Sequence, residues 1–112
     1  MKRIEAIIRP GKVSDVRAAL YKVGIPGMMI SEIEGHGKQK GIEQQLRGKT
    51  YKVDLLNKSK IEVVVNDNEV DNIVKTIQES AFTGKFGDGK IFVSPVENAI
   101  RISTSEKGSI AV

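Results

Sequence analysis

Two glycine-rich, basic segments are the parts of this sequence whose residue types and spacing suit a chemical role. The first reads GHGKQKG over residues 35–41, and the second reads TGKFGDGK over residues 83–90. Glycines at this spacing allow successive backbone N–H groups to converge on an anion, and each lysine adds a positive charge. Neither segment is a Walker A loop or a Gly-x-Gly-x-x-Gly motif. We therefore expect phosphate binding, with a pair of ordinary glycine-rich turns as the alternative.

Positive charge is concentrated in one part of the chain. The 112 residues include 18 lysines and arginines and 14 aspartates and glutamates, a formal net charge of +4. Residues 38–58 contain six of the basic and two of the acidic residues, and therefore account for the whole excess. A basic segment on an otherwise neutral chain indicates an anionic ligand, or an acidic or membrane-bound partner. A solvated basic loop is the alternative.

Several catalytic and metal-binding classes are excluded by the composition. The chain has no cysteine, which excludes disulfides, cysteine-ligated zinc and thiolate catalysis. Its single histidine, His36, argues against a Ser-His-Asp triad or a multi-histidine metal site, and we interpret it as a spacer between glycines. No apolar run approaches 18 residues, and the N-terminal Met-Lys-Arg leads directly into an alternating segment. We therefore expect a cytoplasmic protein that does not insert into a membrane.

Hydrophobic periodicity predicts a mixed α and β domain. Alternation of Ile4, Ala6 and Ile8 is typical of a strand with one buried face, and Gly24 is placed to end the first helix. The predicted elements are strands over residues 3–9, 27–34, 61–65 and 90–93, a short strand over 99–102, and helices over 12–23 and 69–81. This order predicts a single α+β domain over residues 1–112, a ferredoxin-like βαββαβ sandwich with both helices on one face of an antiparallel sheet.

Two features indicate more than a plain monomer. The connection between Gly35 and Lys58 keeps no periodicity, and a structureless connection of about 20 residues is either a misassignment or a functional loop. Its four glycines, three glutamines, six cations and Tyr51 favour a functional, exposed loop. On the sheet face without helices, apolar Ile7 lies close to Arg9. This mixture predicts that further subunits of a cyclic oligomer cover the face.

Three stretches carry a resemblance to a known family. They are IEAIIRP at residues 4–10, GKQKG at 37–41 followed by Arg47-Gly48 and Tyr51, and TGKFGDGKIFV at 83–93. Over essentially all 112 residues, without insertions, the chain resembles the PII nitrogen-regulatory signal-transduction proteins. The resemblance implies a non-enzymatic, ferredoxin-like homotrimer that binds ATP or ADP in three clefts between subunits, with 2-oxoglutarate beside Mg-ATP. It also implies a long exposed T-loop, about residues 37–57, which changes shape with the ligand and docks onto an ammonium transporter or an enzyme of nitrogen metabolism.

The resemblance also implies which residues bind each ligand. The nucleotide contacts would be Ile7, Met29, Gly35, Gly37, Lys38, Gln39, Val64, Gly87, Asp88, Gly89, Lys90, Arg101 and Ser103. The 2-oxoglutarate contacts would be Gly37, Lys38, Gln39, Lys40, Gly41, Lys58 and Gly87. Gln39 matches the family's side-chain magnesium ligand, and Lys58 matches the lysine that pairs with a 2-oxoglutarate carboxylate. Arg47 resembles the arginine that plugs the ammonium channel and Tyr51 the tyrosine uridylylated in some bacteria; an ordinary exposed loop arginine and tyrosine are the alternatives.

Several residues depart from the family pattern. Ser103 stands where a second phosphate-contacting arginine is usual, and because a lost charge-assisted hydrogen bond costs roughly 1.5–3 kcal/mol, we expect weaker ATP binding. Met29 replaces a threonine whose hydroxyl meets adenine, which puts the preference for adenine in question. Leu46 and Lys49-Thr50 change the loop signature and argue against uridylylation. Phe82 stands where a polar residue is common.

The charge of the expected ligand fits the residues that would bind it. ATP carries about four negative charges, so its cleft needs several cations and converging N–H groups to replace water. Lys38, Lys90 and Arg101 would supply the cations. Mg²⁺ favours oxygen ligands, which suits one glutamine amide together with oxygens of ATP and 2-oxoglutarate.

A ferredoxin-like nucleic-acid-binding module with a basic loop is the main alternative function. The predicted strands lack the aromatic stacking residues of an RNA-recognition sheet, so we expect no nucleic-acid partner. A small phosphate-handling enzyme is a third hypothesis, but the sequence contains no recognisable nucleophile–base pair. The resemblance therefore implies a non-enzymatic sensor of nitrogen and energy status, and the sequence offers less support for either alternative.

Overall fold

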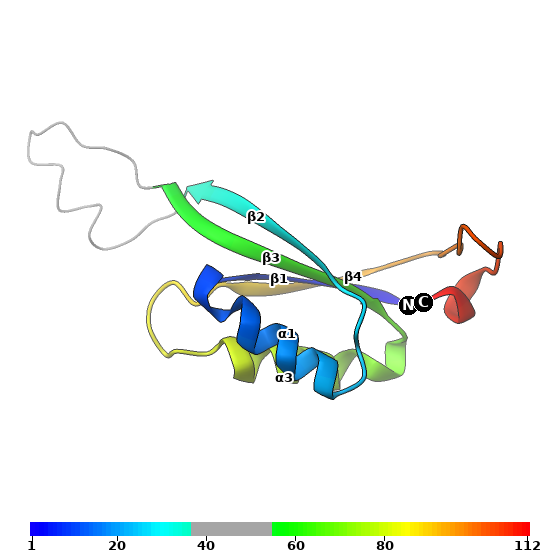
Figure 1. Ribbon diagram of the computed structural model, residues 1–112, viewed down its shortest axis with the longest axis horizontal. Helices are drawn as coiled ribbons and strands as arrows, with labels where there is room; N and C mark the ends of the chain where they lie inside the picture. The colour runs from blue at the N-terminus through cyan, green and yellow to red at the C-terminus, as the bar shows by residue number, and fades with distance from the viewer. Residues whose placement is uncertain (37–54) are drawn as a thin grey trace, which may run out of the picture.

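The computed structural model describes residues 1–36 and 55–112, which form one antiparallel sheet and two helices. The elements are β1 (Lys2–Ile8), α1 (Val13–Lys22), β2 (Met29–His36), β3 (Leu55–Val65), α3 (Val70–Ala81) and β4 (Lys90–Pro95), with 3-10 turns at Pro10–Lys12, Asp67–Glu69 and Gly108–Ala111. The strand order is β2-β3-β1-β4, and every neighbouring pair is antiparallel. Figure 1 shows α1 and α3 side by side on one face of the sheet. The predicted ferredoxin-like α+β sandwich is confirmed.

Branched aliphatic side chains hold the helices on the sheet. In β1, Ile4, Ala6 and Ile8 are buried and the residues between them are only partly buried, because successive side chains of a strand point to opposite faces. Within the described ranges, the buried core consists of Ile4, Ala6, Ile8, Val16, Leu20, Ile61, Val63, Val65, Ile73, Ile77 and Ala81. Among the described residues this core contains no aromatic side chain. Within residues 1–36 and 55–112, no helix is long and apolar enough to cross a membrane.

The hairpin of β2 and β3 is longer than the sequence predicts. β2 continues to His36 and β3 begins at Leu55, so the strand predicted over residues 61–65 was too short and the loop predicted over 37–57 was too long. The backbone pairs include Gly35 with Leu56, but β1 pairs with β3 only from Ser59 onward. The first four residues of β3 therefore pair with β2 alone. Because the backbone of this part of the hairpin pairs outside the main sheet, the sequence pattern that predicted the sheet does not extend to it.

The C-terminal segment forms a turn where a short strand was predicted. The strand predicted over residues 99–102 is wrong, since the only pairing described there is an isolated bridge between Ile100 and Lys107. The chain instead folds back on itself: the Arg101 N–H donates to the Glu106 carbonyl at 2.8 Å, and the Ser105 N–H donates to the Arg101 carbonyl at 2.8 Å. Ser105 adopts a φ of +65° to make this turn. Figure 1 shows that the turn lies beyond β4, at the end of the molecule where the two termini meet.

The sheet face opposite the helices, hereafter the open face, mixes charged and apolar side chains. Ion pairs cross it from Arg3 to Glu62 at 3.7 Å and from Lys60 to Glu5 at 3.5 Å. In the register of the sheet, Glu62 pairs with Met29 and Glu5 pairs with Phe92, whose side chains are 59% and 52% exposed. Large apolar side chains are thus exposed on both edge strands, as the sequence predicts for a face that needs a covering subunit.

The core assignment predicts a large loss of stability for Ile77→Ala. Ile77 is fully buried, and removing a buried branched side chain costs about 2–5 kcal/mol through lost burial and a residual cavity. Urea unfolding at fixed protein concentration measures this loss. Tyr21→Ala is the control on a helix surface, because Tyr21 is 69% exposed and should change the free energy of unfolding by about 0.5 kcal/mol or less. Equal effects of the two substitutions would contradict the described core.

Candidate functional site

The loop between α3 and β4, residues 82–89, is closed by the carboxylate of Asp88. One oxygen of Asp88 accepts the backbone N–H groups of Thr83 at 2.8 Å and Gly84 at 2.9 Å, and the other accepts the Thr83 hydroxyl. The Thr83 hydroxyl in turn accepts the N–H of Lys85 at 3.1 Å. A single side chain therefore fixes the beginning of the loop relative to its end.

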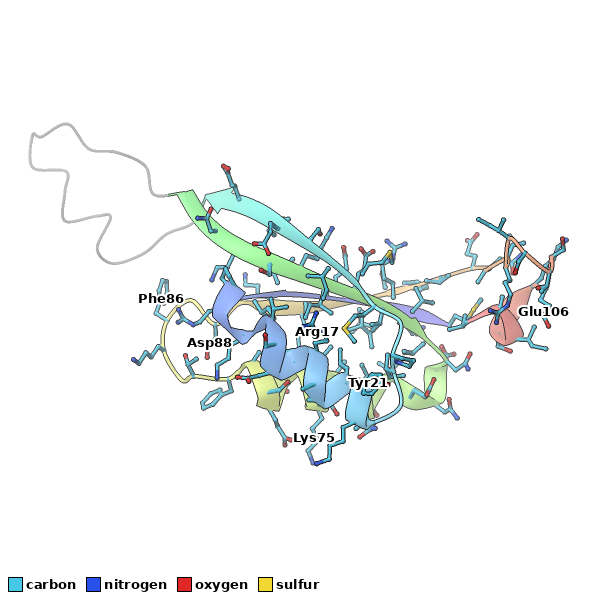
Figure 2. All side chains as sticks on the ribbon, viewed as in Figure 1. Arg17, Tyr21, Lys75, Phe86, Asp88 and Glu106 are labelled. Carbon is cyan, nitrogen blue, oxygen red and sulfur yellow. The ribbon has the colours of Figure 1, made fainter. Side chains whose placement is uncertain are left out.

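Arg9 attaches this closed loop to the end of β1. Its Nε donates to an Asp88 carboxylate oxygen at 3.0 Å, and its Nη2 donates to the Phe86 carbonyl at 2.7 Å. From β3, the Lys58 ammonium donates to the Gly87 carbonyl. Figure 2 shows Phe86 and Asp88 together on this loop, at the end of the sheet from which β2 and β3 project. One cation that follows β1 and one from β3 thus hold the backbone carbonyls of Phe86 and Gly87 and the carboxylate of Asp88.

The same contacts shift the ionisation of the site. Hydrogen bonds from Thr83, together with those from Arg9 and Gly84, hold the pKa of Asp88 well below its ordinary value, although partial burial opposes the shift. Asp88 is therefore ionised throughout the neutral range. Burial, and to a lesser extent the positive charge of Arg9, lowers the pKa of Lys58, while the Asp88 carboxylate opposes this effect. A second anion beside Lys58 and Arg9 would relieve the repulsion between these two cations.

Gly89 brings the loop into direct contact with β1. Its φ is +104°, a region that L side chains rarely adopt, and a Cβ atom built on it would lie 1.7 Å from the carbonyl oxygen of Ile7. Gly87 has a φ of +102°. Glycine is therefore required here for two reasons. Both residues adopt a positive φ, and Gly89 approaches β1 more closely than any residue with a side chain could.

Four cations gather around Ile7 on the open face. Ile7 pairs with Lys60 on one side and with Lys90 on the other, so the three side chains share a face. Arg9 and Lys58 lie at the adjacent end of the same strands, next to the loop. Among the described residues, Asp88 pairs with Arg9 and Glu5 with Lys60. The cluster keeps an excess of positive charge beside exposed backbone of the glycine loop, an arrangement suited to a polyanion with several phosphates.

The residues predicted for the nucleotide, together with Lys58, which was predicted for 2-oxoglutarate, fall into three groups within the described part of the chain. Those brought together at the loop end of the open face are Ile7, Lys58, Gly87, Asp88, Gly89 and Lys90, with Gly35 nearby in the extended hairpin. Met29 and Val64 lie on the open face in rows further from the loop. Arg101 and Ser103 are not brought to the loop, because they lie in the C-terminal turn; Figure 2 labels Asp88 and Glu106 at opposite ends of the sheet. Outside the described residues lie Gly37, Lys38, Gln39, Lys40, Gly41, Leu46, Arg47, Lys49-Thr50 and Tyr51.

Arg9 is the site residue that sequence reasoning missed. Arg9 was expected on the open face and belongs to the IEAIIRP stretch, but no role in the site was predicted for it. The sequence does contain a feature that could have indicated its role, because Arg9 directly precedes Pro10 just after the end of β1. In a βαββαβ sheet with β1 beside β4, that end lies next to the connection from α3 to β4. A cation at that position is therefore placed to contact the second glycine-rich segment.

A cavity of about 430 Å³ lies on the helix side of the same loop, and Asp88, Gly89 and Lys90 of the loop end contribute to its lining. Its lining includes Val74 and Ala81 from α3, Ile91 from β4 and Phe82, whose side chain is 66% exposed. The lining is mainly apolar, and Ile8 rather than Ile7 contributes to it from β1. Because the cations gather on the opposite face, we locate the anion site on the open face. In the part of the chain that the structure describes, no group of three or more His, Cys, Asp or Glu side chains could hold a metal ion.

The closure of the loop predicts a pH-dependent effect of Asp88→Asn. Because folding lowers the pKa of Asp88, its ionised form stabilises the protein fully above the ordinary value near 3.8, and this contribution is lost as the pH falls below that value. The difference in urea midpoint between the natural protein and Asp88→Asn should be greatest above pH 5 and shrink toward pH 2. Glu79→Gln, on the exposed side of α3, is the matched control with a far smaller effect. A difference that stays constant with pH would contradict the closure.

The close contact between Gly89 and the Ile7 carbonyl predicts that Gly89→Ala destabilises the protein far more than Gly24→Ala. Both glycines have positive φ, +104° and +92°, but a Cβ on Gly24 meets nothing within 4 Å. Gly24→Ala should therefore cost about 1–2 kcal/mol from backbone strain alone. Gly89→Ala adds a clash with the Ile7 carbonyl, and the loop must move away from β1. Hydrogen exchange of the Thr83 and Gly84 amides should accelerate in Gly89→Ala only. Equal protection in both variants would overturn this assignment.

Comparisons with known proteins identify the family to which this arrangement belongs. The family model described as Nitrogen regulatory protein P-II matches residues 1–106. The chain is 54% identical over 112 residues to the nitrogen regulatory protein P-II of Nostoc punctiforme, with complete coverage of both chains, and 53% identical to nitrogen regulatory protein P-II 2 of Methanothermobacter thermautotrophicus, with coverage of 100% of this chain and 97% of that one. The crystal structure of Arabidopsis thaliana PII bound to citrate superposes with a TM-score of 0.80 at 37% identity, covering 99% of this chain and 91% of the other. These names confirm the prediction of a regulatory, non-enzymatic protein. The chain belongs to the PII family of nitrogen regulatory proteins.

Proposed function

We propose that this PII protein senses ATP or ADP together with 2-oxoglutarate, and that the loop of residues 83–90 holds the nucleotide phosphates. The observation that carries the proposal is the fixed loop itself. Asp88 and Arg9 hold its backbone in one conformation, so its N–H groups need no reordering when an anion binds. Lys90 and Lys58 lie next to it and add charge.

The nucleotide base has a compatible surface beside the cations. Ile7, Val64 and Met29 lie on the open face among the charged residues of the Arg3–Glu62 and Lys60–Glu5 ion pairs, and we propose that these three apolar side chains contact the adenine ring. Met29 offers no hydroxyl to the base, so discrimination between adenine and guanine would depend on backbone groups. The absence of this hydroxyl is the reason why Met29 puts the preference for adenine in question.

The position of Arg101 supports a site shared between copies of the chain. β4 has six residues, which span about 20 Å at the usual strand rise, and Arg101 follows six residues after its end. A phosphate held at Gly87–Lys90 is therefore out of reach of Arg101 of the same chain. We propose that a second copy supplies Arg101, that the assembly is a homotrimer with three such sites, and that its subunits cover the open face.

Lys58 supports a carboxylate effector next to the phosphates. Its ammonium donates to the Gly87 carbonyl, and its pKa is lowered by burial and by the positive charge of Arg9. A carboxylate of 2-oxoglutarate would relieve the repulsion between these two cations, and the citrate carried by the Arabidopsis relative is likewise a carboxylate. Mg²⁺ would arrive with the phosphates and bridge the two ligands, with Gln39, which lies outside the described residues, as the protein ligand that we propose.

We further propose that ligand binding controls a protein partner through the basic segment of residues 37–57. If 2-oxoglutarate binds one state of this segment better than another, it shifts the equilibrium by that difference in affinity. The partner would be an ammonium transporter in the membrane or an enzyme of nitrogen metabolism, contacted by Arg47 and Tyr51, and the protein would act in the cytoplasm. An RNA-binding role receives less support, because Phe92 is the only aromatic residue in the described strands.

Calorimetry of Lys58→Met tests the ligand assignment. In the natural protein, 2-oxoglutarate and Mg-ATP should each tighten the binding of the other. Lys58→Met keeps the apolar stem but removes the ammonium, so 2-oxoglutarate should bind roughly tenfold or more weakly and should no longer tighten Mg-ATP binding. Lys75→Met, on the exposed side of α3, is the matched control and should bind both ligands normally. Independent binding of the two ligands to the natural protein, or normal 2-oxoglutarate binding by Lys58→Met, would refute the proposal.

A further inference from the structure

The C-terminal turn holds the guanidinium of Arg101 in a defined orientation. Its Nε donates to a Glu106 carboxylate oxygen at 3.0 Å, and its Nη2 donates to the Ile110 carbonyl at 3.3 Å. Two of the five guanidinium N–H donors are used in these bonds. The side chain of Arg101 remains 45% exposed. One side of the guanidinium is therefore anchored, and Nη1 is not used by either bond.

Glu106 is also held in place by hydrogen bonds other than the one from Arg101. The carboxylate oxygen that accepts from Arg101 also accepts the Thr104 hydroxyl at 2.9 Å, and the Thr104 hydroxyl oxygen accepts the backbone N–H of Glu106 at 3.2 Å. Backbone hydrogen bonds between Arg101 and Glu106 and from Ser105 to Arg101 close the same turn. Residues 101–106 thus form a hydrogen-bonded frame. Its effect is to hold the Arg101 guanidinium in one position.

An arginine that only faces solvent does not need such a hydrogen-bonded frame. Arg101 is the only arginine after residue 47, and no residue of the buried core is among its hydrogen-bond partners in the described part of the chain. A free arginine side chain must lose its rotamer freedom when it binds an anion, whereas an anchored one has already lost it. A carboxylate at Nε also leaves the outer N–H donors available for a planar, two-bond contact with phosphate oxygens.

We propose that Glu106 is a positioning residue for the nucleotide: it orients Arg101 so that its free N–H donors meet a phosphate held by the glycine loop of a second copy. The inference rests on the proposed function, since it requires Arg101 to contact the nucleotide. It adds that the carboxylate assists phosphate binding, although its charge alone would repel the ligand. The Glu106 carboxylate already accepts hydrogen bonds from Arg101 and Thr104, which reduces its repulsion of the phosphate. The affinity gained by orienting Arg101 therefore exceeds the affinity lost to this repulsion.

Calorimetry with Mg-ATP on the full-length protein tests this role with four variants. Glu106→Gln should weaken binding about three- to tenfold, the equivalent of reordering one long side chain. Glu106→Asp should recover part of the loss, because it keeps an acceptor for Nε. Glu97→Gln removes the same charge from the same segment outside the turn and should stay within twofold. In an Arg101→Ala background, Glu106→Gln should have no further effect.

The outcomes separate the inference from the function on which it rests. If Glu106→Gln tightens Mg-ATP binding, the carboxylate competes with phosphate, and the positioning role is wrong. If Arg101→Ala weakens binding but Glu106→Gln binds as the natural protein does, or weakens binding equally in the Arg101→Ala background, the inference fails while the proposed nucleotide site stands. If Arg101→Ala binds Mg-ATP normally, both fail. Adenosine, which has no phosphate, should bind all of these variants alike.

Discussion

The ionised carboxylate of Asp88 is the contact on which the candidate site depends. It accepts two backbone N–H groups and one hydroxyl from the start of the loop and pairs with Arg9 from β1. A loop rich in glycine has a high conformational entropy, so without such a contact its N–H groups would sample many directions. The carboxylate removes this freedom. Positive φ values at Gly87 and Gly89 and the tight approach to Ile7 follow from the same closure.

The direction of β4 imposes the second constraint. The strand leads away from the loop, so Asp88 of the loop and Glu106 of the C-terminal turn lie at opposite ends of the sheet (Figure 2), and Arg101 is hydrogen-bonded to Glu106. If both the loop and Arg101 contact one nucleotide, the binding site exists only in an assembly. Assembly also hides the exposed apolar side chains of the open face, such as Met29 and Phe92. Burial of the open face between copies would thus both stabilise the assembly and complete the ligand-binding site.

Periodicity was enough to predict the fold, because each main element has one buried face. Ile4, Ala6 and Ile8 alternate for that reason, and the helices repeat their apolar residues accordingly. The start of β3 and the turn after Ala99 could not be predicted, since hydrogen bonds outside the core define them and leave no hydrophobic pattern. The glycines of the site were recognisable from their spacing. Arg9 was not, because its partner Asp88 is 79 residues away in sequence and only the sheet order brings the two together.

The most direct test of a divided nucleotide site is complementation between two defective chains. Arg101→Ala keeps the glycine loop intact, and Lys90→Ala keeps Arg101 intact, so each variant alone should bind Mg-ATP poorly. When the two are coexpressed and purified as mixed oligomers, some sites combine the intact loop of one chain with the intact arginine of the other. We predict that a fraction of tight Mg-ATP sites returns in the mixed oligomers. Mixed oligomers that bind no better than either variant alone would contradict a site shared between copies.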